Sequence, residues 1–422
     1  MTTYHITPPL QLHANIQLPA SKSISNRALI IHALAGGGEL PSNLSDCDDT
    51  EVIIRALRDM PETIDIGAAG TAMRFMTALL AATERGKHIL TGTERMRHRP
   101  IQLLVDALRR LGADISYVGE EDYPPLRISG RRLEGGMVDI AGNVSSQYIS
   151  ALLMIGPMLD RGLTLRLNGD IISRPYIDLT LWTMREFGAD AEWTDVDTIT
   201  IMPRPYQPRP YLIENDWSAA SYWYEMVALT KDPEAEVQLH GLMDGSKQGD
   251  SSVRYLFSLL GVRTVFASKE PGRPTTVTLR KNGHCVPRLE YDFVNAPDLA
   301  QTFVVTCCAL GVPFRFTGLH TLRIKETDRI LALQTELRKL GYFIESRDDC
   351  ELSWDGTRHS LPSENEAEEK PTIQTYKDHR MALSFAPLAL CGGIAIADPQ
   401  VVTKSYPRFW DDLRSSHFAI SE

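Results

Sequence analysis

Cationic and hydroxyl side chains gather in the segment LPASKSISNRALIIHALAGG, residues 18–37. Four of them lie within six residues, immediately before an apolar stretch: Lys22, Ser23, Ser25 and Arg27. A helix N-terminus presents free backbone N–H groups and the positive end of the helix dipole, so it attracts anions. Cations at that end oppose the dipole unless an anion compensates them. The segment therefore predicts an anion site at the start of a helix.

The same arrangement recurs before other apolar stretches. Gly70 precedes one of them with Arg74 one turn later, Ser145, Ser146 and Gln147 start another, and Arg380 follows Asp378 at a further one. Ser and Asp are also favoured N-caps without any ligand, and a single such start would indicate only a cap. Several starts with cations nearby favour binding of more than one anionic group.

Acid–base chemistry is indicated by the segment LRIKETDRILALQTELRKLG, residues 322–341. Lys325 and Arg329 are four residues apart, so one helix face would carry both, and Glu326 and Arg329 are three apart. A carboxylate among cations stays ionised, or donates a proton only in a shielded pocket. Taken alone, the segment would indicate a surface helix with ion pairs.

A repeated unit positions these residues. Segments beginning at His88, Leu163, Val237 and Phe314 each follow the order strand, Gly, polar loop, amphipathic helix, Gly, strand. The first glycines of the four copies are Gly92, Gly169, Gly241 and Gly318, and the second are Gly112, Gly188, Gly261 and Gly341. A Gly after an amphipathic helix is the expected C-terminal cap. Four aligned copies predict a true repeat of α/β units.

Helices that are apolar nearly all round lie between the copies, as in AGTAMRFMTALLAAT and SSQYISALLMIGPML. Such helices are buried, so each unit carries one outer amphipathic helix and one buried helix. Sheets wrapped around buried helices invert the usual α/β layering. We therefore expect two similar α/β domains of three units each, with a hinge within residues 209–218, after a Pro-rich stretch.

Composition limits the class of protein. The chain has 422 residues, 43% hydrophobic residues and a net charge of −10, which argues against nonspecific binding of nucleic acid. Its six cysteines include no CxxC pair and no zinc spacing, so no metal site is expected. We expect neither a secretory signal nor a membrane span, and a cytoplasmic location with reduced thiols.

Together these motifs resemble the 5-enolpyruvylshikimate-3-phosphate (EPSP) synthase family of enolpyruvyl transferases. The resemblance runs over nearly the whole chain, through SKSISNRA, GTAMR, RMRHRP, SSQYISALLM, SRPYID, IKETDR, YKDHRMA and KSYP in this order. It implies a two-domain inside-out α/β barrel, each domain built of three βαβαββ units. Residues 1–17 and 215–422 would form one domain and residues 18–214 the other, with the active site in the cleft between them.

The resemblance also implies the reaction. Enolpyruvyl would pass from phosphoenolpyruvate to the 5-hydroxyl of shikimate 3-phosphate, with loss of phosphate, in chorismate and aromatic amino acid biosynthesis. No cofactor is implied, and we expect a monomer whose partners are these small molecules. Asp298 would act as base in the addition and Glu326 as the proton shuttle at C3, with Lys22 a competing proton donor.

Binding residues carry over by position. Shikimate 3-phosphate would be held by Lys22, Ser23, Arg27, Ser145, Ser146, Gln147, Ser173, Tyr176, Asp298 and Lys325. Phosphoenolpyruvate would be held by Lys22, Gly70, Arg99, Gln147, Arg329, Arg380 and Lys404. Two polyanionic substrates explain why so many cations are needed.

Three positions depart from the family pattern. Ala68 stands where the family usually has Asn, Phe75 where it has Pro, and Thr321 where it has Asn. The first two bear on phosphoenolpyruvate affinity and on sensitivity to the herbicide glyphosate, and Thr321 bears on one contact to shikimate 3-phosphate. We expect activity, because the acid–base groups and cations are present.

Two other readings remain open. UDP-N-acetylglucosamine enolpyruvyl transferases share the fold and the donor, but they have Asn directly after the early Lys and usually a loop Cys. Here Ser23 follows Lys22, and no Cys lies between Cys47 and Cys285. The second is an anion-binding protein without catalysis, which binding without turnover would support.

Overall fold

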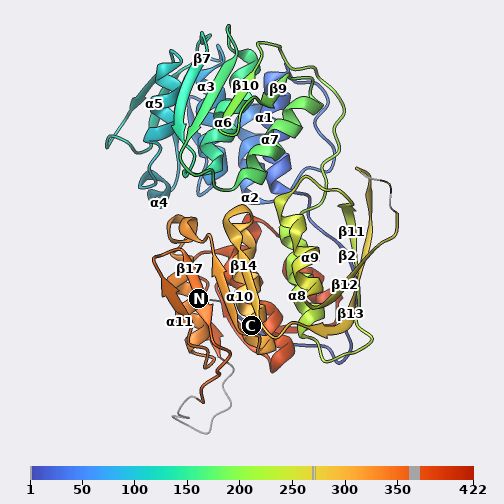
Figure 1. Ribbon diagram of the computed structural model, residues 1–422. Helices are drawn as coiled ribbons and strands as arrows, with labels where there is room; N and C mark the ends of the chain where they lie inside the picture. The colour runs from blue at the N-terminus through green and yellow to red at the C-terminus, as the bar shows by residue number, and fades with distance from the viewer. Residues whose placement is uncertain (1, 269, 271, 361–370) are drawn as a thin grey trace. The chain divides into compact units, whose positions relative to one another are not determined.

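The computed structural model describes residues 2–268, 270, 272–360 and 371–422. The chain forms two compact units (Figure 1). The terminal unit comprises Met1–Pro19 and Glu214–Glu422, and the inserted unit comprises Ala20–Ile213. The chain thus leaves the terminal unit after its second strand and returns just before helix α8 (Trp217–Leu229).

The described residues contain five sheets of four strands, and all five share one strand order. The first strand pairs parallel with the second, the second antiparallel with the fourth, and the fourth antiparallel with the third. This is the order that a βαβαββ unit produces. In the inserted unit the two sheets are formed by β3 (Thr63–Asp65), β4 (Lys87–Thr91), β5 (Asp114–Tyr117) and β6 (Leu126–Ser129), and by β7 (Gly136–Ala141), β8 (Leu163–Asn168), β9 (Ala191–Trp193) and β10 (Thr198–Ile201).

The terminal unit contains three such sheets, two of which join distant parts of the chain. Their strands are β2 (His13–Gln17), β11 (Glu236–Met243), β12 (Leu260–Phe266) and β13 (Pro274–Cys285); β14 (Leu289–Asp292), β15 (Phe314–Thr317), β16 (Glu345–Arg347) and β17 (Glu351–Trp354); and β1 (Thr3–Thr7), β18 (Thr372–Ile373), β19 (Ile394–Ala397) and β20 (Ala419–Ser421).

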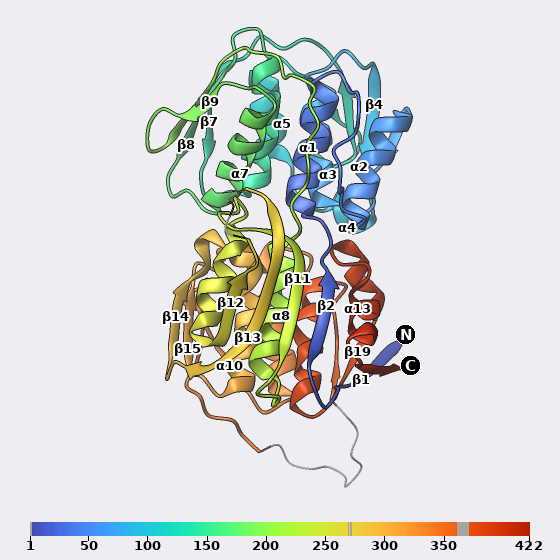
Figure 2. The same cartoon turned by 90° about the vertical axis from the view of Figure 1, so that its right-hand side faces the viewer.

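The two N-terminal strands, β1 and β2, complete sheets whose other strands come from the second half of the chain. Strand β2 pairs in parallel with β11 across the whole inserted unit, with His13 opposite Glu236. Strand β1 lies between β19 and β20, antiparallel to both, and so supplies the fourth strand of the last unit. Figure 2 shows β2 beside β11, and both chain ends at the β1 sheet. These pairings close the terminal unit.

One of the three units expected in the inserted unit is incomplete. Within residues 20–213, the unit containing α1 (Lys22–Leu34) and α2 (Asp48–Asp59) keeps its helices, but it has no four-stranded sheet. A parallel β-bridge between Ser42 and Leu212 stands in place of such a sheet. The inserted unit therefore holds two complete βαβαββ units and one reduced to its helices.

Buried helices fill the centre of each unit, as the sequence predicts. In the inserted unit they are α1, α3 (Gly70–Ala81) and α6 (Ser146–Ile155), which contact one another, and every residue of α3 is buried. In the terminal unit they are α8, α10 (Ala300–Leu310) and α12 (His379–Phe385), the last continued by the 3₁₀ turns of η6 (Ala386–Cys391). Apolar surface faces these helices from the sheets, so the expected inside-out layering is confirmed.

Amphipathic outer helices follow the second strand of each unit: α5 (Gln102–Arg110), α7 (Arg174–Glu186), α9 (Val253–Ser258), α11 (Arg329–Arg338) and α13 (Phe409–Ser415). In α5 only the apolar face is buried, through Leu104, Val105 and Leu108 among others. The glycines predicted to follow four of these helices have positive φ, 84° at Gly188 and 86° at Gly341 for example. Glycine adopts this conformation without steric cost, and there the chain turns into the next strand.

Shorter elements complete the chain. They are α4 (Glu94–Arg97) and the 3₁₀ turns η1 (Gly156–Met158), η2 (Gly249–Ser252), η3 (Phe293–Asn295), η4 (Pro297–Leu299), η5 (His320–Ile324) and η7 (Pro399–Lys404). Three of them, η2, η4 and η7, carry polar groups of the candidate site. Among the described residues, no helix has the length and apolar character needed to cross a membrane.

Candidate active site

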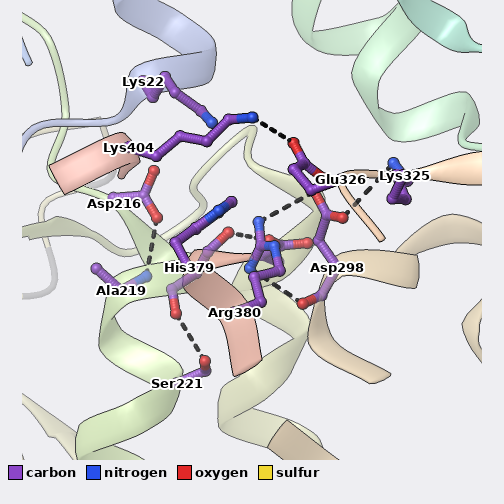
Figure 3. A network of polar contacts seen from close by, with 12 residues as sticks. Lys22, Asp216, Ala219, Ser221, Asp298, Lys325, Glu326, His379, Arg380 and Lys404 are labelled. Atoms are coloured by element: carbon purple, nitrogen blue, oxygen red, sulfur yellow. Dashed lines mark hydrogen bonds and ion pairs between the residues drawn. The ribbon is translucent and has the colours of Figure 1, made fainter. Parts of the chain in front are cut away.

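Charged side chains of the terminal unit converge from four segments far apart in the sequence. Asp298 lies in η4, Arg380 lies in the first turn of α12, and Lys404 ends η7. Lys325 and Glu326 lie between η5 and α11, so they are outside the helix that their spacing predicted, which begins only at Arg329. Figure 3 shows Asp298, Glu326 and Arg380 directed toward one another, with ion pairs drawn between them and their neighbours. Asp298 and Arg380 lie at the starts of buried helices, and Lys325, Glu326 and Lys404 lie before outer helices.

Arg329 is the centre of this cluster. Its guanidinium is almost completely buried and binds three carboxylates: Nε lies 2.7 Å from Asp378 Oδ2, Nη1 3.1 Å from Asp298 Oδ1, and Nη2 2.9 Å from Glu326 Oε2. Burial alone would lower its pKa, but Asp378, Glu326 and Asp298 outweigh burial and raise the pKa of Arg329 above its usual value. The residue is therefore a permanent cation that orients three acids at once.

Asp298 is surrounded by cations. Its Oδ1 also lies 3.6 Å from Lys325 Nζ, and its Oδ2 lies 3.0 Å from Arg380 Nη2. Burial would raise the pKa of Asp298, but Arg380, Lys325 and Arg329 hold it well below the usual range. About a fifth of the side chain is exposed, so an ionised oxygen is accessible from outside the cluster.

Glu326 bridges Lys404 and Arg329. Its Oε1 accepts from Lys404 Nζ at 2.8 Å, while Oε2 binds Arg329. Burial would raise the pKa of Glu326, but Lys404, Arg329 and His379 together hold it well below its usual value. In this state Glu326 is a carboxylate, so it must first gain a proton before it can donate one.

Arg380 is fixed by its own helix start. Asp378 caps α12 by accepting the backbone N–H of Arg380 at 2.9 Å. The Arg380 guanidinium also donates to the Asp298 carbonyl at 3.1 Å and to the buried Tyr222 hydroxyl at 3.3 Å. Burial raises the pKa of Tyr222 to about 12, so this phenol stays neutral. Asp378 was predicted from the sequence only as part of a helix start, and Tyr222 was not singled out at all.

Two further acids lie in the same unit and were missed from the sequence. Asp216 caps α8, accepting the Ala219 N–H at 2.8 Å, and the buried Asp250 of η2 accepts the Ser218 hydroxyl. Burial, with the nearby charge of Asp298, raises the pKa of Asp250 to about 6. The Asp before an apolar stretch in ENDWSAAS is a capping signal, whereas nothing local in QGDSS indicates that Asp250 is buried.

In the inserted unit, predicted residues lie at the starts of α1, α3, α6 and α7. Lys22 is the first residue of α1, and its Nζ lies 3.4 Å from Oδ2 of the buried Asp49 in α2. Asp49 could not be singled out from motif spacing, because only the packing of α1 against α2 brings it to Lys22.

Arg27 ties three helices of the inserted unit together. Its Nε donates to Thr180 Oγ1 at 2.7 Å in α7 and its Nη2 to Ser150 Oγ at 3.1 Å in α6. It also donates to the carbonyls of Ser23 and Tyr176. Burial lowers the pKa of Arg27 to about 10, so it remains charged at neutral pH. These contacts hold Ser23 and Tyr176 near the start of α1.

The start of α3 is lined by cations. A Cβ at Gly70 would lie 2.8 Å from Arg74 Nη1 and 2.9 Å from Arg99 Nη1, so a larger residue here would displace both guanidiniums. Gln147 donates to Thr71 at 3.1 Å, which joins the starts of α6 and α3. Free N–H groups, two guanidiniums and an amide at one helix N-terminus are suited to an anion.

Hydroxyl groups mark the other two helix starts. Ser145 caps α6, accepting the Gln147 N–H at 3.4 Å, and Ser146 is buried beside it. Ser173 precedes α7 with φ of 54°, a left-handed conformation that is uncommon for serine and typical of ligand-holding sites.

Comparison with known proteins decides the family. The family profile described as EPSP synthase (3-phosphoshikimate 1-carboxyvinyltransferase) matches residues 6–64 and 59–413. The chain belongs to the EPSP synthase family. A 3-phosphoshikimate 1-carboxyvinyltransferase of Bacteroides fragilis is 58% identical over 418 residues, which cover 99% of this chain and 98% of that protein. One from Photobacterium profundum is 34% identical over 98% of both chains.

Solved structures agree on the fold. An EPSP synthase structure from Acinetobacter baumannii superposes with a TM-score of 0.75, covering 100% of both chains at 20% identity. The likeness supports the two-domain α/β fold that the repeats predict. Membership of the EPSP synthase family also decides against the UDP-N-acetylglucosamine reading.

The three departures from the EPSP synthase pattern have different surroundings. Phe75 is fully buried, and its ring centroid lies 5.5 Å from the Arg27 guanidinium carbon, so it supports Arg27 through a cation–π contact. Ala68 is exposed two residues before Gly70. Thr321 keeps a buried hydroxyl with no partner among the described residues. Phe75 thus bears on the site indirectly, through its contact with Arg27.

Proposed function

We propose that this chain transfers the enolpyruvyl group of phosphoenolpyruvate to the 5-hydroxyl of shikimate 3-phosphate, with Asp298, Glu326 and Lys22 moving the protons. The transferase activity, in the shikimate pathway of aromatic amino acid biosynthesis, follows from membership of the EPSP synthase family. The assignment of individual residues rests on the charged cluster around Arg329. Substrates held by residues of both units would engage the terminal and inserted units together.

The observation that carries the assignment is a pair of ionised carboxylates kept among cations. Asp298 and Glu326 both bind Arg329, 3.1 and 2.9 Å away, and each binds a second cation, Arg380 or Lys404. When an anionic substrate arrives, it competes for the same cations. The pKa of each carboxylate then rises toward its usual value, because its stabilising charges are shared. Substrate binding therefore makes Asp298 and Glu326 stronger bases.

The reaction follows in two steps. In the addition, Asp298 takes the 5-hydroxyl proton, the hydroxyl oxygen bonds to C2 of phosphoenolpyruvate as the C2=C3 double bond opens, and Glu326, protonated from solvent, gives a proton to C3. In the elimination, C3 returns a proton to Glu326, the C2=C3 double bond re-forms and the C2–O bond to phosphate breaks. Inorganic phosphate leaves with the proton that Asp298 took, and Lys22 is the competing donor of that proton. Arg329, Arg380, Lys404 and Arg99 offset charge on the carboxylate and phosphate, which makes C2 electrophilic.

The binding assignment divides between the units. We assign shikimate 3-phosphate to the hydroxyl-rich helix starts of the inserted unit and to Lys325 and Asp298. We assign phosphoenolpyruvate to the start of α3 with Arg99, and to Arg329, Arg380 and Lys404. The contact of Gln147 with Thr71 supports its place between both substrates. A monomer in the cytoplasm completes the proposal, and all six cysteines are free thiols.

Phosphate release tests the function directly. The purified protein is expected to release phosphate from phosphoenolpyruvate when shikimate 3-phosphate is present, and not when UDP-N-acetylglucosamine replaces it. A malachite-green assay measures both reactions in parallel. Binding of both substrates without release would favour the anion-binding protein, and release only with the sugar nucleotide would mean that the acceptor is wrong.

Lys22 is expected to act through its compact ammonium group. Lys22→Ala should lower kcat by about 10²- to 10³-fold, because a cation at a developing charge is lost. Lys22→Arg is the matched control, since it keeps the charge beside Asp49 but cannot place it identically. We expect the Arg variant to unfold at the wild-type temperature and still to be slow. A fully active Arg variant would limit Lys22 to a general charge effect.

A further inference from the structure

One face of α11 contacts the segment before α12 at two points. Glu336 lies seven residues after Arg329, two helical turns further along, so both side chains leave the same face of the helix. Arg329 binds Asp378 at the end of this segment. Glu336 has a completely buried carboxylate, which is unusual for an ionisable group without a structural or functional task.

Three groups satisfy the Glu336 carboxylate. Oε1 accepts the Tyr376 hydroxyl at 2.5 Å, and Oε2 accepts the Gln374 backbone N–H at 3.0 Å and Lys339 Nζ at 2.6 Å. Burial and the bond to Glu336 raise the pKa of Tyr376, so its hydroxyl remains a donor. Lys339 also donates to the Thr372 carbonyl at 3.3 Å. Glu336 thus holds Gln374 and Tyr376 along α11, and Lys339 holds Thr372.

The backbone between the two contacts is strained. Tyr376 and Lys377 both have left-handed conformations, with φ of 53° and 57°. Two successive left-handed residues other than glycine persist only where surrounding contacts fix them. Asp378 follows at once, and its N–H bonds to the Thr375 carbonyl at 2.8 Å. The strained pair sets the direction in which Asp378 and Arg380 enter the site.

We infer that Glu336 is a positioning residue for the reaction, which holds the strained segment 374–377 so that Asp378 and Arg380 keep their places on Arg329 and Asp298. The inference rests in part on the proposed function, because Arg380 is assigned there to phosphoenolpyruvate. Glu336 itself is two turns from Arg329 and is not assigned to touch substrate.

Glu336→Gln tests this role, because it keeps the shape and removes the charge. Displacing Arg380 by a fraction of an ångström should raise KM for phosphoenolpyruvate and lower kcat, by about 10- to 100-fold in kcat/KM. Tyr376→Phe removes one contact only and should give a smaller change in the same direction. The double variant should be no worse than Glu336→Gln alone, since both changes break one linkage.

Hydrogen exchange gives a readout that does not depend on turnover. Amides of residues 374–380 should exchange faster in Glu336→Gln than in the wild type. Glu351→Gln is the matched control, because Glu351 is a carboxylate of the same unit that binds a different cation, Arg315, at 2.7 Å. It should affect thermal stability without changing KM or exchange at residues 374–380.

Two results would overturn the inference. One is unchanged exchange at residues 374–380 in Glu336→Gln, whether or not the wild type is active. The other is a Glu336→Gln protein that melts earlier but keeps both KM values and kcat per folded molecule, which would make Glu336 a stability residue only. If Glu336→Gln does not fold, Tyr376→Phe decides by the same two measurements.

Discussion

Asp298→Asn is expected to lower kcat by about 10³-fold while KM for phosphoenolpyruvate stays at or below its wild-type value. The loss is of the size that removal of a general base produces. KM for phosphoenolpyruvate should not rise. The neutral amide removes one negative charge beside Arg380, Lys325 and Arg329, so these cations attract the anionic substrate at least as strongly as before. Steady-state kinetics of phosphate release, with each substrate varied in turn, measure both quantities.

A matched control separates chemistry from structure. Asp328→Asn changes an acid of the same region that caps α11, accepting the Leu331 N–H at 3.0 Å, and pairs with Arg323. It should cost about 1 kcal/mol of stability or less and leave kcat unchanged. Near-normal turnover in folded Asp298→Asn would remove Asp298 from the role of base.

Arg329→Met is expected to have the second large effect, on stability as well as on activity. The substitution leaves Asp298, Glu326 and Asp378 without their shared cation in a buried setting. Breaking a buried ion pair on one side costs about 3–5 kcal/mol. Urea unfolding at pH 8 measures the loss, and phosphate release should fall to background because both acids lose their orientation.

The loss should depend on pH in a definite direction. In the wild type, the pKa values of Asp298 and Glu326 are depressed in the folded state, so their stabilisation is present above the unfolded pKa of about 4 and is lost as pH falls below it. In Arg329→Met, burial raises these pKa values, and protonation relieves the penalty. The difference between the two proteins should therefore be smaller at pH 5 than at pH 8.

A surface pair provides the reference for this experiment. Arg315→Met removes a pair with Glu351 in which the Arg side chain is about half exposed, and it should lower the free energy of unfolding only slightly at either pH. An Arg329→Met penalty of that size, or one equal at pH 5 and pH 8, would contradict a buried triple ion pair.

Local pattern was sufficient for most of the architecture. The glycine spacing predicted the α/β repeat, because a helix that turns into a strand needs a left-handed residue at the turn. Helices apolar on every side, such as α3 and α6, could only be buried, and this implied the inverted layering. The order of motifs from SKSISNRA to KSYP was enough to indicate the family that the comparisons confirm.

Long-range pairing was not accessible in the same way. Nothing in residues 13–17 indicates that they pair with β11, more than two hundred residues later, or that one unit of residues 20–213 lacks a four-stranded sheet. Strand partners are chosen by the packed core as a whole, and short strands carry too few residues to specify a partner.

Residue types and their spacing were enough to indicate which groups are suited to anions: cations, hydroxyls and glycine at helix starts, and a carboxylate beside two cations in IKETDR. The charge states and the neighbours of these groups became visible only in the folded chain. Arg329 joins acids from positions 298, 326 and 378, Asp250 has its pKa raised to about 6, and Glu336 holds a strained segment forty residues away. The charge state of a group depends on its distance from other charges and on its burial. The order of residues in the chain determines neither of these.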